Sequence, residues 1–374
     1  MMANDLSAYS NFLFGCRFCP MCKPAGEVAN LTMLESHTTR ARAMMLWRIA
    51  NDLATWGSRE VELLYQSTLD SISQAWCVNH YPVSEYMAVA RVEVFRAGLA
   101  PESVQQALQR TTPEPVPVNG DVLLLASEAA ELGDAKAYQP ALQALARAGV
   151  QAKPLVAASG ALTYSLGDRQ CARDQATRVV DLIQESNAWM VIADSPQTLW
   201  ALHRIYPVLE VSLPTGVTVT SLSEHLARAV QEGRLTLPRH DGERIFFHDS
   251  RSACLVADEM AQAEVIQPGY RGPEETLGKG EVYDAPRRLV DNMGMERLCS
   301  VWSRSLSKSC GADDGLWLIY PKLAEGLARQ RLQEAKQLGA ELIITDSVLC
   351  ARHLARAAEE GDVHVHWLPE LLAA

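Results

Sequence analysis

The sequence has no long hydrophobic run and no excess of basic residues. Its apolar stretches are strand-sized, far short of the ~20 apolar residues that a membrane-spanning helix needs. The formal net charge of −11 argues against a nucleic-acid partner, because no basic excess is available to neutralise phosphates. The N-terminus also lacks the basic segment and apolar core of a secretory signal. We therefore expect a cytoplasmic protein without a transmembrane segment, which reaches a membrane only through a partner.

Recognisable catalytic and nucleotide-binding patterns are also missing. No nucleophile stands at a known spacing from a base, and there is no Walker or dinucleotide-binding glycine fingerprint. We therefore assign no catalytic residue to this chain. What the sequence does have is nine cysteines among 374 residues, which in a reducing compartment are more often ligands or buried thiols than disulfides.

The chain divides by pattern into a helical first part and an alternating second part. Prolines and a glycine mark a linker at 113–120, after a stretch with helical periodicity. Beyond the linker, short apolar runs alternate with helical stretches, which is typical of α/β units with largely parallel sheets. The expected strands are 121–127, 153–159, 189–195, 244–250 and 341–347. We predict an α+β multidomain chain with a helical domain at 1–112 and α/β halves at 121–235 and 236–374.

A short internal repeat relates the two α/β halves. The segment VIADSPQTLWALHRI (191–205) is similar to IITDSVLCARHLARA (343–357). Asp194-Ser195 matches Asp346-Ser347, and Thr198 falls where Cys350 falls. We therefore expect both halves to share one fold.

The strongest chemical signal is the segment CRFCPMCKPAG, which holds Cys16, Cys19 and Cys22. Its spacing follows the bacterial ferredoxin run C-x2-C-x2-C-x3-C-P, but Gly26 stands at the fourth position. In two-cluster ferredoxins the fourth cysteine of each run binds the other cluster. Cys77 fits that role, and the same spacing counted back from it gives Ser67, Asp70 and Ser73. The ligand set of one cluster is thus missing, and the ligand set of the other cluster remains.

This pattern predicts one [4Fe-4S] cluster held by Cys16, Cys19, Cys22 and Cys77, since thiolates are soft donors that suit iron in sulfide clusters. Other interpretations are a zinc ion whose fourth ligand is His37 or Cys77, an open-iron site with three cysteines, or free thiols. The arginines of the next helix fit a solvated face, or the docking of an acidic partner, or the charge of the cluster. They are Arg40, Arg42 and Arg48.

A resemblance to a known family rests on the segments CRFCPMC and HYPVSEYMAVARVEVFRAG and on the two α/β halves. Nearly the whole chain resembles the iron–sulfur subunits with cysteine-rich CCG domains. Such subunits serve anaerobic glycerol-3-phosphate dehydrogenase, glycolate oxidase, lactate-utilisation systems and heterodisulfide reductase. The resemblance implies an N-terminal helical ferredoxin-like domain followed by two CCG domains. It also implies electron transfer between a flavoprotein dehydrogenase and a quinone or another acceptor.

The CCG motifs of this chain are degenerate. FFHDSRSAC (246–254), YDAPRRLVDNMG (283–294), SKSCGADDGLWL (307–318) and ITDSVLCARHL (344–354) resemble the family's segments. However, Arg251, Ser309 and Ser347 stand where the family has cysteines. The first half, with AASGAL (157–162) and ADSPQT (193–198), keeps no ligand cysteine. We therefore expect the noncubane cluster of the family to be lost.

Three cysteines of the second half remain as a candidate second site. Cys310 and Cys350 stay in register with the family motifs, and Cys254 comes three residues late. Joined by His248 or Asp346, these thiols would suit a small zinc site; the other interpretation is a set of buried thiols left on a scaffold. Cys299 is expected in the core.

The resulting functional expectation is an electron-transfer subunit with one cluster. It exchanges single electrons with a flavin-dependent dehydrogenase partner, which carries the flavin, and with a further acceptor such as a quinone reductase or a ferredoxin. The Cys16–Cys22 loop is expected near the partner interface. An alternative is a structural or assembly subunit in which the cluster only stabilises the fold. A thiol reductase of the heterodisulfide type is a third interpretation, and the missing CCG cysteines weaken it.

Overall fold

The computed structural model describes residues 5–110, 114–134, 136–257, 259–260 and 274–373. The first residue of the expected linker, 113, lies outside the described residues. So do residues 1–4 and 111–112 of the expected helical domain, and residues 135, 258, 261–273 and 374 of the two α/β halves.

The first part of the chain is helical. Helix α6 is buried on nearly every side, which matches a sequence that is apolar around most of its circumference. The helices pack into a core with Tyr86, Leu64 and Leu13 near its centre. The elements are η1 (Leu6–Tyr9), α1 (Ser10–Cys16), η2 (Lys23–Ala25), α2 (Glu27–Thr32), η3 (Glu35–His37), α3 (Thr39–Ala50), α4 (Ser58–Tyr65), α5 (Ser71–Ala75), α6 (Val83–Arg96) and α7 (Glu102–Leu108).

The first α/β half contains a four-stranded parallel sheet in the order β2-β1-β3-β4. Its strands are β1 (Val122–Leu125), β2 (Lys153–Leu155), β3 (Met190–Ala193) and β4 (Thr218–Ser221). The two central strands, β1 and β3, are buried on both faces, as their continuous apolar sequences predict. The helices are α8 (Ser127–Leu132), α9 (Gln139–Arg147), α10 (Ala161–Leu166), α11 (Arg169–Ser186), α12 (Pro196–Trp200), the π-helix η4 (Ala201–Ile205), α13 (Tyr206–Val208) and α14 (Leu222–Gln231).

The second half contains a parallel sheet in the order β10-β9-β5-β8. Its strands are β5 (Arg244–Phe247), β8 (Glu296–Arg297), β9 (Leu342–Thr345) and β10 (His364–Trp367), and a small antiparallel pair joins β6 (Glu259–Met260) to β7 (Gly278–Lys279). The helices are α15 (Arg251–Val256), η6 (Glu274–Leu277), α16 (Glu281–Asn292), η7 (Arg304–Leu306), η8 (Asp313–Gly315), α17 (Leu316–Ile319), α18 (Pro321–Leu338), α19 (Val348–Ala357) and α20 (Leu368–Ala373).

The two sheets have the same strand order. Each sheet, counted in chain order of its own four strands, begins with its second strand, β2 or β8. The first, third and fourth strands of that sheet follow. The repeat seen in the sequence also recurs in detail. The Ser195 hydroxyl accepts from the Thr198 N–H at 3.3 Å in front of α12, and the Ser347 hydroxyl accepts from the Cys350 N–H at 3.0 Å in front of α19. The mixed α/β architecture with parallel sheets is therefore confirmed.

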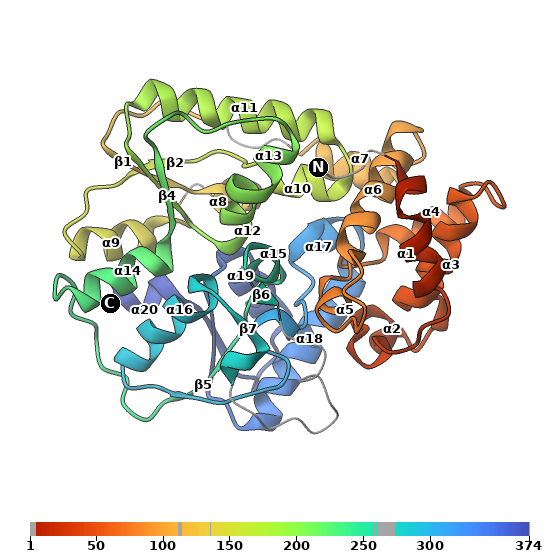
Figure 1. Cartoon of the computed structure of the whole chain (residues 1–374). Helices are drawn as coiled ribbons and strands as arrows, with labels where there is room; N and C mark the ends of the chain where they lie inside the picture. The colour runs from red at the N-terminus through yellow and green to blue at the C-terminus, as the bar shows by residue number, and fades with distance from the viewer. Residues whose placement is uncertain (1–4, 111–113, 135, 258, 261–273, 374) are drawn as a thin grey trace.

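The three parts of the chain share their cores. One apolar cluster joins Leu124 and Ile192 of the first sheet to Ile245 and Ile344 of the second. Helices α9 and α14 pack against α20 and α16 between the two halves, on the side of the molecule away from the N-terminal helices (Figure 1). The N-terminal helices pack in turn on α10, α17 and α18. Within the described residues, no helix combines the length and apolar character needed to cross a membrane.

Candidate functional site

The four N-terminal cysteines line one cavity. Cys16 ends α1, Cys19 and Cys22 lie in the loop that follows, and Cys77 comes two residues after α5. Cys16 is buried and the other three are half-buried. The remaining wall of the cavity is formed by Met21, Thr39, Ser73, Val78, Asn79, Tyr81 and Val83. Two segments far apart in the sequence therefore present their thiols to the same space.

Local backbone contacts place these thiols. The Cys19 N–H donates to the Cys16 carbonyl at 3.0 Å, which closes a turn between the first two cysteines. The Cys77 N–H donates to the Gln74 carbonyl at 3.1 Å, and the Tyr81 N–H donates to Cys77 Sγ at 3.5 Å. A side chain at Gly15 would collide with the Tyr81 hydroxyl. The glycine before Cys16 therefore lets the Cys77 segment approach α1.

The spacing of the four sulfur atoms bears on which metal they suit. Around a single zinc ion with Zn–S bonds of about 2.3 Å, tetrahedral sulfurs stand about 3.8 Å apart. Among the described residues, the only group of three or more potential ligands whose donor atoms all lie within 4.8 Å of one another is found elsewhere, at His248. The four N-terminal cysteines do not form so compact a group.

His37 is not placed to complete a zinc site. Its Nδ1 lies 2.7 Å from the Thr32 hydroxyl and its Nε2 lies 2.9 Å from Gln66 Oε1. Both ring nitrogens are therefore engaged, and the residue is absent from the wall of the cysteine cavity. Of the two fourth ligands considered for zinc, only Cys77 shares the cavity.

The cavity is electrostatically unfavourable for free thiolates. Burial raises the pKa of Cys16 to about 12 and that of Cys22 to about 11. The Tyr86 hydroxyl lies 3.5 Å from Cys16 Sγ, and the hydroxyls of Ser73 and Thr39 are hydrogen-bond partners of Cys22. A bound metal would take the place of the thiol protons, and these hydroxyls would then stabilise the negative sulfurs.

Charged and hydroxyl side chains occupy the positions of the missing second cysteine run. Asp70 adopts a left-handed backbone conformation, with φ of 51°, and is buried. Its carboxylate accepts from the Thr39 hydroxyl at 3.2 Å and forms an ion pair with Arg42 at 3.2 Å. The Ser73 hydroxyl accepts from Thr39 at 2.8 Å, and that of Ser67 accepts from an arginine of α6 at 3.2 Å. An ion pair and hydroxyl groups therefore occupy this region. Hydroxyls are poor ligands for iron in sulfide clusters.

The arginines of α3 do not form one solvated face. Arg48 is exposed, and Arg40 pairs with Glu35 near the surface. Arg42, by contrast, is 1% exposed and donates to the carbonyls of His37 and Leu63 in addition to Asp70. The expectation of a solvated face was wrong for Arg42, because a helical-period pattern cannot show that a buried carboxylate lies opposite an arginine.

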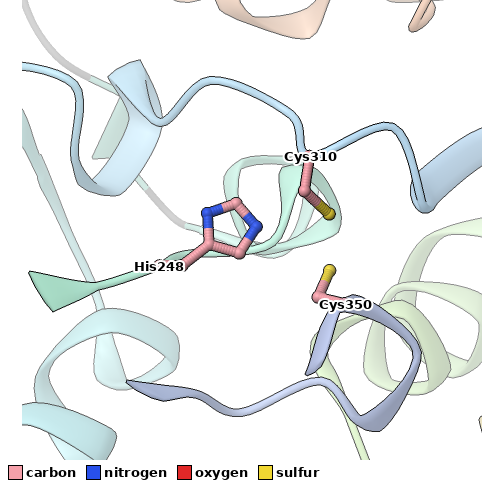
Figure 2. A group of neighbouring side chains, drawn as sticks. All are labelled: His248, Cys310 and Cys350. Carbon is pink, nitrogen blue, oxygen red and sulfur yellow. The ribbon is translucent and has the colours of Figure 1, made fainter. Parts of the chain in front are cut away.

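A second group of potential ligands lies in the second α/β half. His248, Cys310 and Cys350 are fully buried, and their donor atoms all lie within 4.8 Å of one another. Figure 2 shows the imidazole ring and both sulfur atoms directed into the same space. Neither Cys254 nor Asp346 belongs to this group. The structure therefore keeps two of the three predicted cysteines together with His248, one of the two further ligands considered, whereas Cys254 stands apart beside Arg251 and Ser71.

The fold explains why these three residues meet. His248 directly follows β5, and Cys350 lies in the first turn of α19, which follows β9. Strands β5 and β9 are adjacent and parallel, so both residues lie at the carboxyl edge of the sheet, where α/β proteins place their ligand sites. Cys310 precedes Gly311, whose φ is +88° and whose position would bring a Cβ within 2.7 Å of the Ala324 backbone. Glycine at 311 thus lets the Cys310 segment lie against α18.

The ionisation of this group differs between its members. Burial lowers the pKa of His248 well below its usual range, and Arg331 and His353 act in the same direction. The pKa of Cys350 is raised well above its usual range by its hydrogen bond with Cys310 and by burial. The imidazole is therefore neutral at pH 7 and can act as a ligand, while the Cys350 thiol holds its proton until a metal replaces it.

The remaining cysteines carry no such arrangement among the described residues. Cys171 is half-buried in α11, and Cys299 is exposed. The prediction that Cys299 is a core residue was wrong.

Comparisons with known proteins give a fold but no function. No family model matches the chain, and no curated protein matches it. One solved structure, described as a hypothetical protein from Helicobacter pylori, matches with a TM-score of 0.57 and 10% sequence identity. The match covers 89% of this chain and 66% of that chain, so this chain spans slightly less than two thirds of its neighbour. At this identity the similarity concerns the fold alone.

Proposed function

We propose that this chain is an iron–sulfur electron-transfer subunit of the CCG-domain type, with one [4Fe-4S] cluster bound by Cys16, Cys19, Cys22 and Cys77. The observation that carries the proposal is the shared cavity of these four thiols. Four thiolates are the ligand set of a [4Fe-4S] cluster, and soft sulfur donors suit its iron. When bound, such a cluster supplies reversible one-electron transfer.

The side chains around the cysteines tune and shield such a group. The Tyr86 hydroxyl next to Cys16 Sγ and the Tyr81 N–H next to Cys77 Sγ donate to sulfur once the thiolates ligate metal. Hydrogen bonds to sulfur stabilise the more negative, reduced state and so raise the reduction potential. Asp70, which also faces Cys22, acts in the opposite sense, and Arg42 offsets its charge.

The surface next to the cysteine loop fits contact with an electron-transfer partner. Phe14, Phe18 and Met21 are 51%, 64% and 53% exposed, although they flank ligands of the proposed cluster. The Arg17 guanidinium lies 3.8 Å from the centroid of the Phe14 ring and 3.8 Å from that of Trp47, which holds the loop against α3. Exposed aromatic residues and methionine are enriched at protein interfaces.

The partner in this proposal is a flavin-dependent dehydrogenase subunit, with a further acceptor such as a quinone reductase or a ferredoxin. The flavin belongs to the partner, since it converts a two-electron oxidation into single-electron steps. The complex would lie in the cytoplasm, and any contact with a membrane would come through a partner.

The second candidate function is a structural subunit in which the metal only stabilises the fold. The observation that favours it is that Cys16 belongs to the same apolar cluster as Leu13, Leu46 and Tyr86. Metal ligation there would hold together the core of the helical part.

Electron exchange with a reduced flavin separates the two functions. The chain, purified without oxygen, is mixed with photoreduced flavin mononucleotide while the visible absorption is followed. An electron-transfer subunit bleaches in one rapid phase, regains its absorption on oxidation, and keeps its iron through several cycles. A structural site stays unchanged or loses iron on reduction, and either result would reject the proposed function. The variant Cys171→Ser serves as the control for a thiol remote from the cavity.

A further inference from the structure

His248 is buried without a hydrogen-bond partner. Its exposed fraction is 0%, and within the described part of the chain neither Nδ1 nor Nε2 has a partner. A polar group removed from water without a hydrogen bond destabilises the folded state. The ring faces the sulfur atoms of Cys310 and Cys350 (Figure 2). An imidazole nitrogen directed at two thiols, and otherwise unsatisfied, is the arrangement expected of a metal ligand.

The first α/β half provides an internal comparison for this site. In the parallel register, Phe247 pairs with Ile344, and Leu124 pairs with the matching residue of β3, Ile192. The residue that corresponds to His248 is therefore Leu125. Ser159 corresponds to Cys310, because each precedes a left-handed glycine at which an added Cβ would lie 2.7 Å from the backbone of a helix. Thr198 corresponds to Cys350 by the repeat.

The corresponding positions of the first half contain no metal ligand, and their hydroxyls are satisfied. The Ser159 hydroxyl accepts from Ser127 at 2.9 Å, and the Thr198 hydroxyl donates to Asp194 at 2.5 Å. The same backbone thus folds around Leu125, Ser159 and Thr198 without a metal. The fold itself does not require a histidine and two cysteines in the second half.

We propose that His248, Cys310 and Cys350 bind one zinc ion, at a site independent of the N-terminal cysteines. One imidazole nitrogen and two thiolates are a donor set that zinc prefers, and their 4.8 Å clustering suits a single ion. Binding displaces two thiol protons to solvent, so the dication and two thiolates are together neutral. No fourth protein ligand belongs to the group within the described residues, and water takes the remaining position.

The surroundings of the site are compatible with this charge balance. Arg331 and His353 face His248, and Asp313 and Glu128 face Cys350. Cationic and acidic side chains thus both face the proposed ion. A neutral zinc–dithiolate unit can be buried here at a lower cost than a free dication.

Metal titration of the full chain tests the proposal. The chain is purified without oxygen, stripped of zinc with a chelator, and titrated with cobalt(II) while its iron content is measured separately. We expect a thiolate-to-cobalt absorption that saturates at about one equivalent per chain and disappears when zinc is added. A chain that takes up neither cobalt nor zinc would overturn the proposal. So would a disulfide between Cys310 and Cys350 in peptides mapped without reduction.

The internal comparison supplies variants that should fold. His248→Leu, Cys310→Ser and Cys350→Thr each introduce the residue of the first half, and each should lose the cobalt absorption and the zinc. Cys254→Ser, a buried cysteine of the same half outside the group, is the matched control and should bind as the parent chain does. Binding that survives all three substitutions but is lost in Cys77→Ser would assign the zinc to the N-terminal cavity and overturn the proposal. Iron content is expected to be unchanged in the three variants, so this outcome is read separately from the proposed electron-transfer function.

Discussion

Arg42 Nη1 lies 3.2 Å from Asp70 Oδ2, and both side chains are buried. Asp70 stands where ferredoxin spacing counted back from Cys77 would place a ligand cysteine. The ion pair occupies the region of the missing cysteine run and borders Cys22 of the proposed cluster site. This region of the helical part is therefore held by charge and hydrogen bonds.

Breaking this ion pair should destabilise the protein strongly. Asp70→Ala leaves the buried Arg42 charge without its carboxylate, and we expect a loss of about 3–5 kcal/mol in the free energy of unfolding. Arg42→Ala should cost at least as much, because it also frees the carbonyls of His37 and Leu63. Urea unfolding measures both. Arg329→Ala removes exposed ion pairs with Glu325 and Glu359 and should cost less than about 1 kcal/mol. Equal losses in the buried and exposed variants would contradict this account.

The hydrogen bond between Tyr86 and Cys16 should set part of the reduction potential. Tyr86→Phe removes a donor 3.5 Å from Cys16 Sγ, so the reduced state loses stabilisation and the potential falls. We expect a decrease on the order of tens of mV, since 59 mV corresponds to a factor of ten for one electron. A potentiometric titration followed by EPR measures it. The Tyr65 hydroxyl donates to the Leu166 carbonyl instead, so Tyr65→Phe is the control and should leave the potential unchanged. An unchanged potential in Tyr86→Phe would show that Tyr86 does not tune the cluster.

Gly167 should be required where the helical part meets the first α/β half. Its φ is +100°, and a Cβ there would lie 2.6 Å from the Arg91 carbonyl oxygen of α6. Gly167→Ala therefore combines backbone strain with a clash that neither backbone can avoid, and we expect a loss of several kcal/mol. Gly133 has a φ of +70°, and a Cβ added there would have no other atom within 4 Å. Gly133→Ala should therefore cost only about 1 kcal/mol. Thermal unfolding of both variants checks the difference, and similar losses would contradict the close approach.

Buried carboxyl groups should make the protein less stable at alkaline pH. Burial raises the pKa of Glu131 to about 8, from an ordinary value near 4.5. The folded state therefore holds a proton that the unfolded state releases, so stability is fully present below the ordinary pKa and is lost as the pH rises toward 8. The histidines with lowered pKa act in the opposite sense only as the pH falls below about 6.5.

A substitution at Glu131 isolates this contribution. Glu131→Gln keeps an acceptor for the Gln197 amide, which donates to Glu131 at 2.7 Å, and removes the charge. Between pH 6.5 and 8 the parent chain should lose about 1.5 kcal/mol more than the variant. Urea unfolding at the two pH values measures this difference. A variant with the same pH dependence as the parent would show that Glu131 ionises normally.

Much of the fold could be predicted from the sequence, because its signals are local. Continuous apolar runs marked β1, β3, β5 and β9, and the Asp-Ser repeat marked two similar strand–helix units. Strands β4 and β8 were not predicted. Strand β8 spans only Glu296–Arg297, and β4, Thr218–Ser221, has alternating polar residues at a sheet edge. Such short or edge strands depend on pairing with a neighbour, which periodicity does not show.

The candidate sites also differ in whether their signal in the sequence is local. The Cys16, Cys19 and Cys22 loop is a local motif, and the spacing rule for a second run selected Cys77. The sequence offered His248 only as one of two possible further ligands, because its neighbours in space, Cys310 and Cys350, lie far away in the sequence. Its signal was a polar residue directly after a buried strand, next to the strand that precedes Cys350. The placement of Arg42 opposite Asp70 had no sequence signal, since only the tertiary structure brings α3 next to the residue that precedes α5.

Iron and acid-labile sulfide per chain, with EPR before and after dithionite, test the central claim most directly. The claim predicts about four iron and four sulfide per chain and a signal that appears on reduction. It also predicts that Cys77→Ser loses this cluster while Cys171→Ser keeps it. Zinc without sulfide in the N-terminal cavity, or a full cluster in Cys77→Ser, would contradict it.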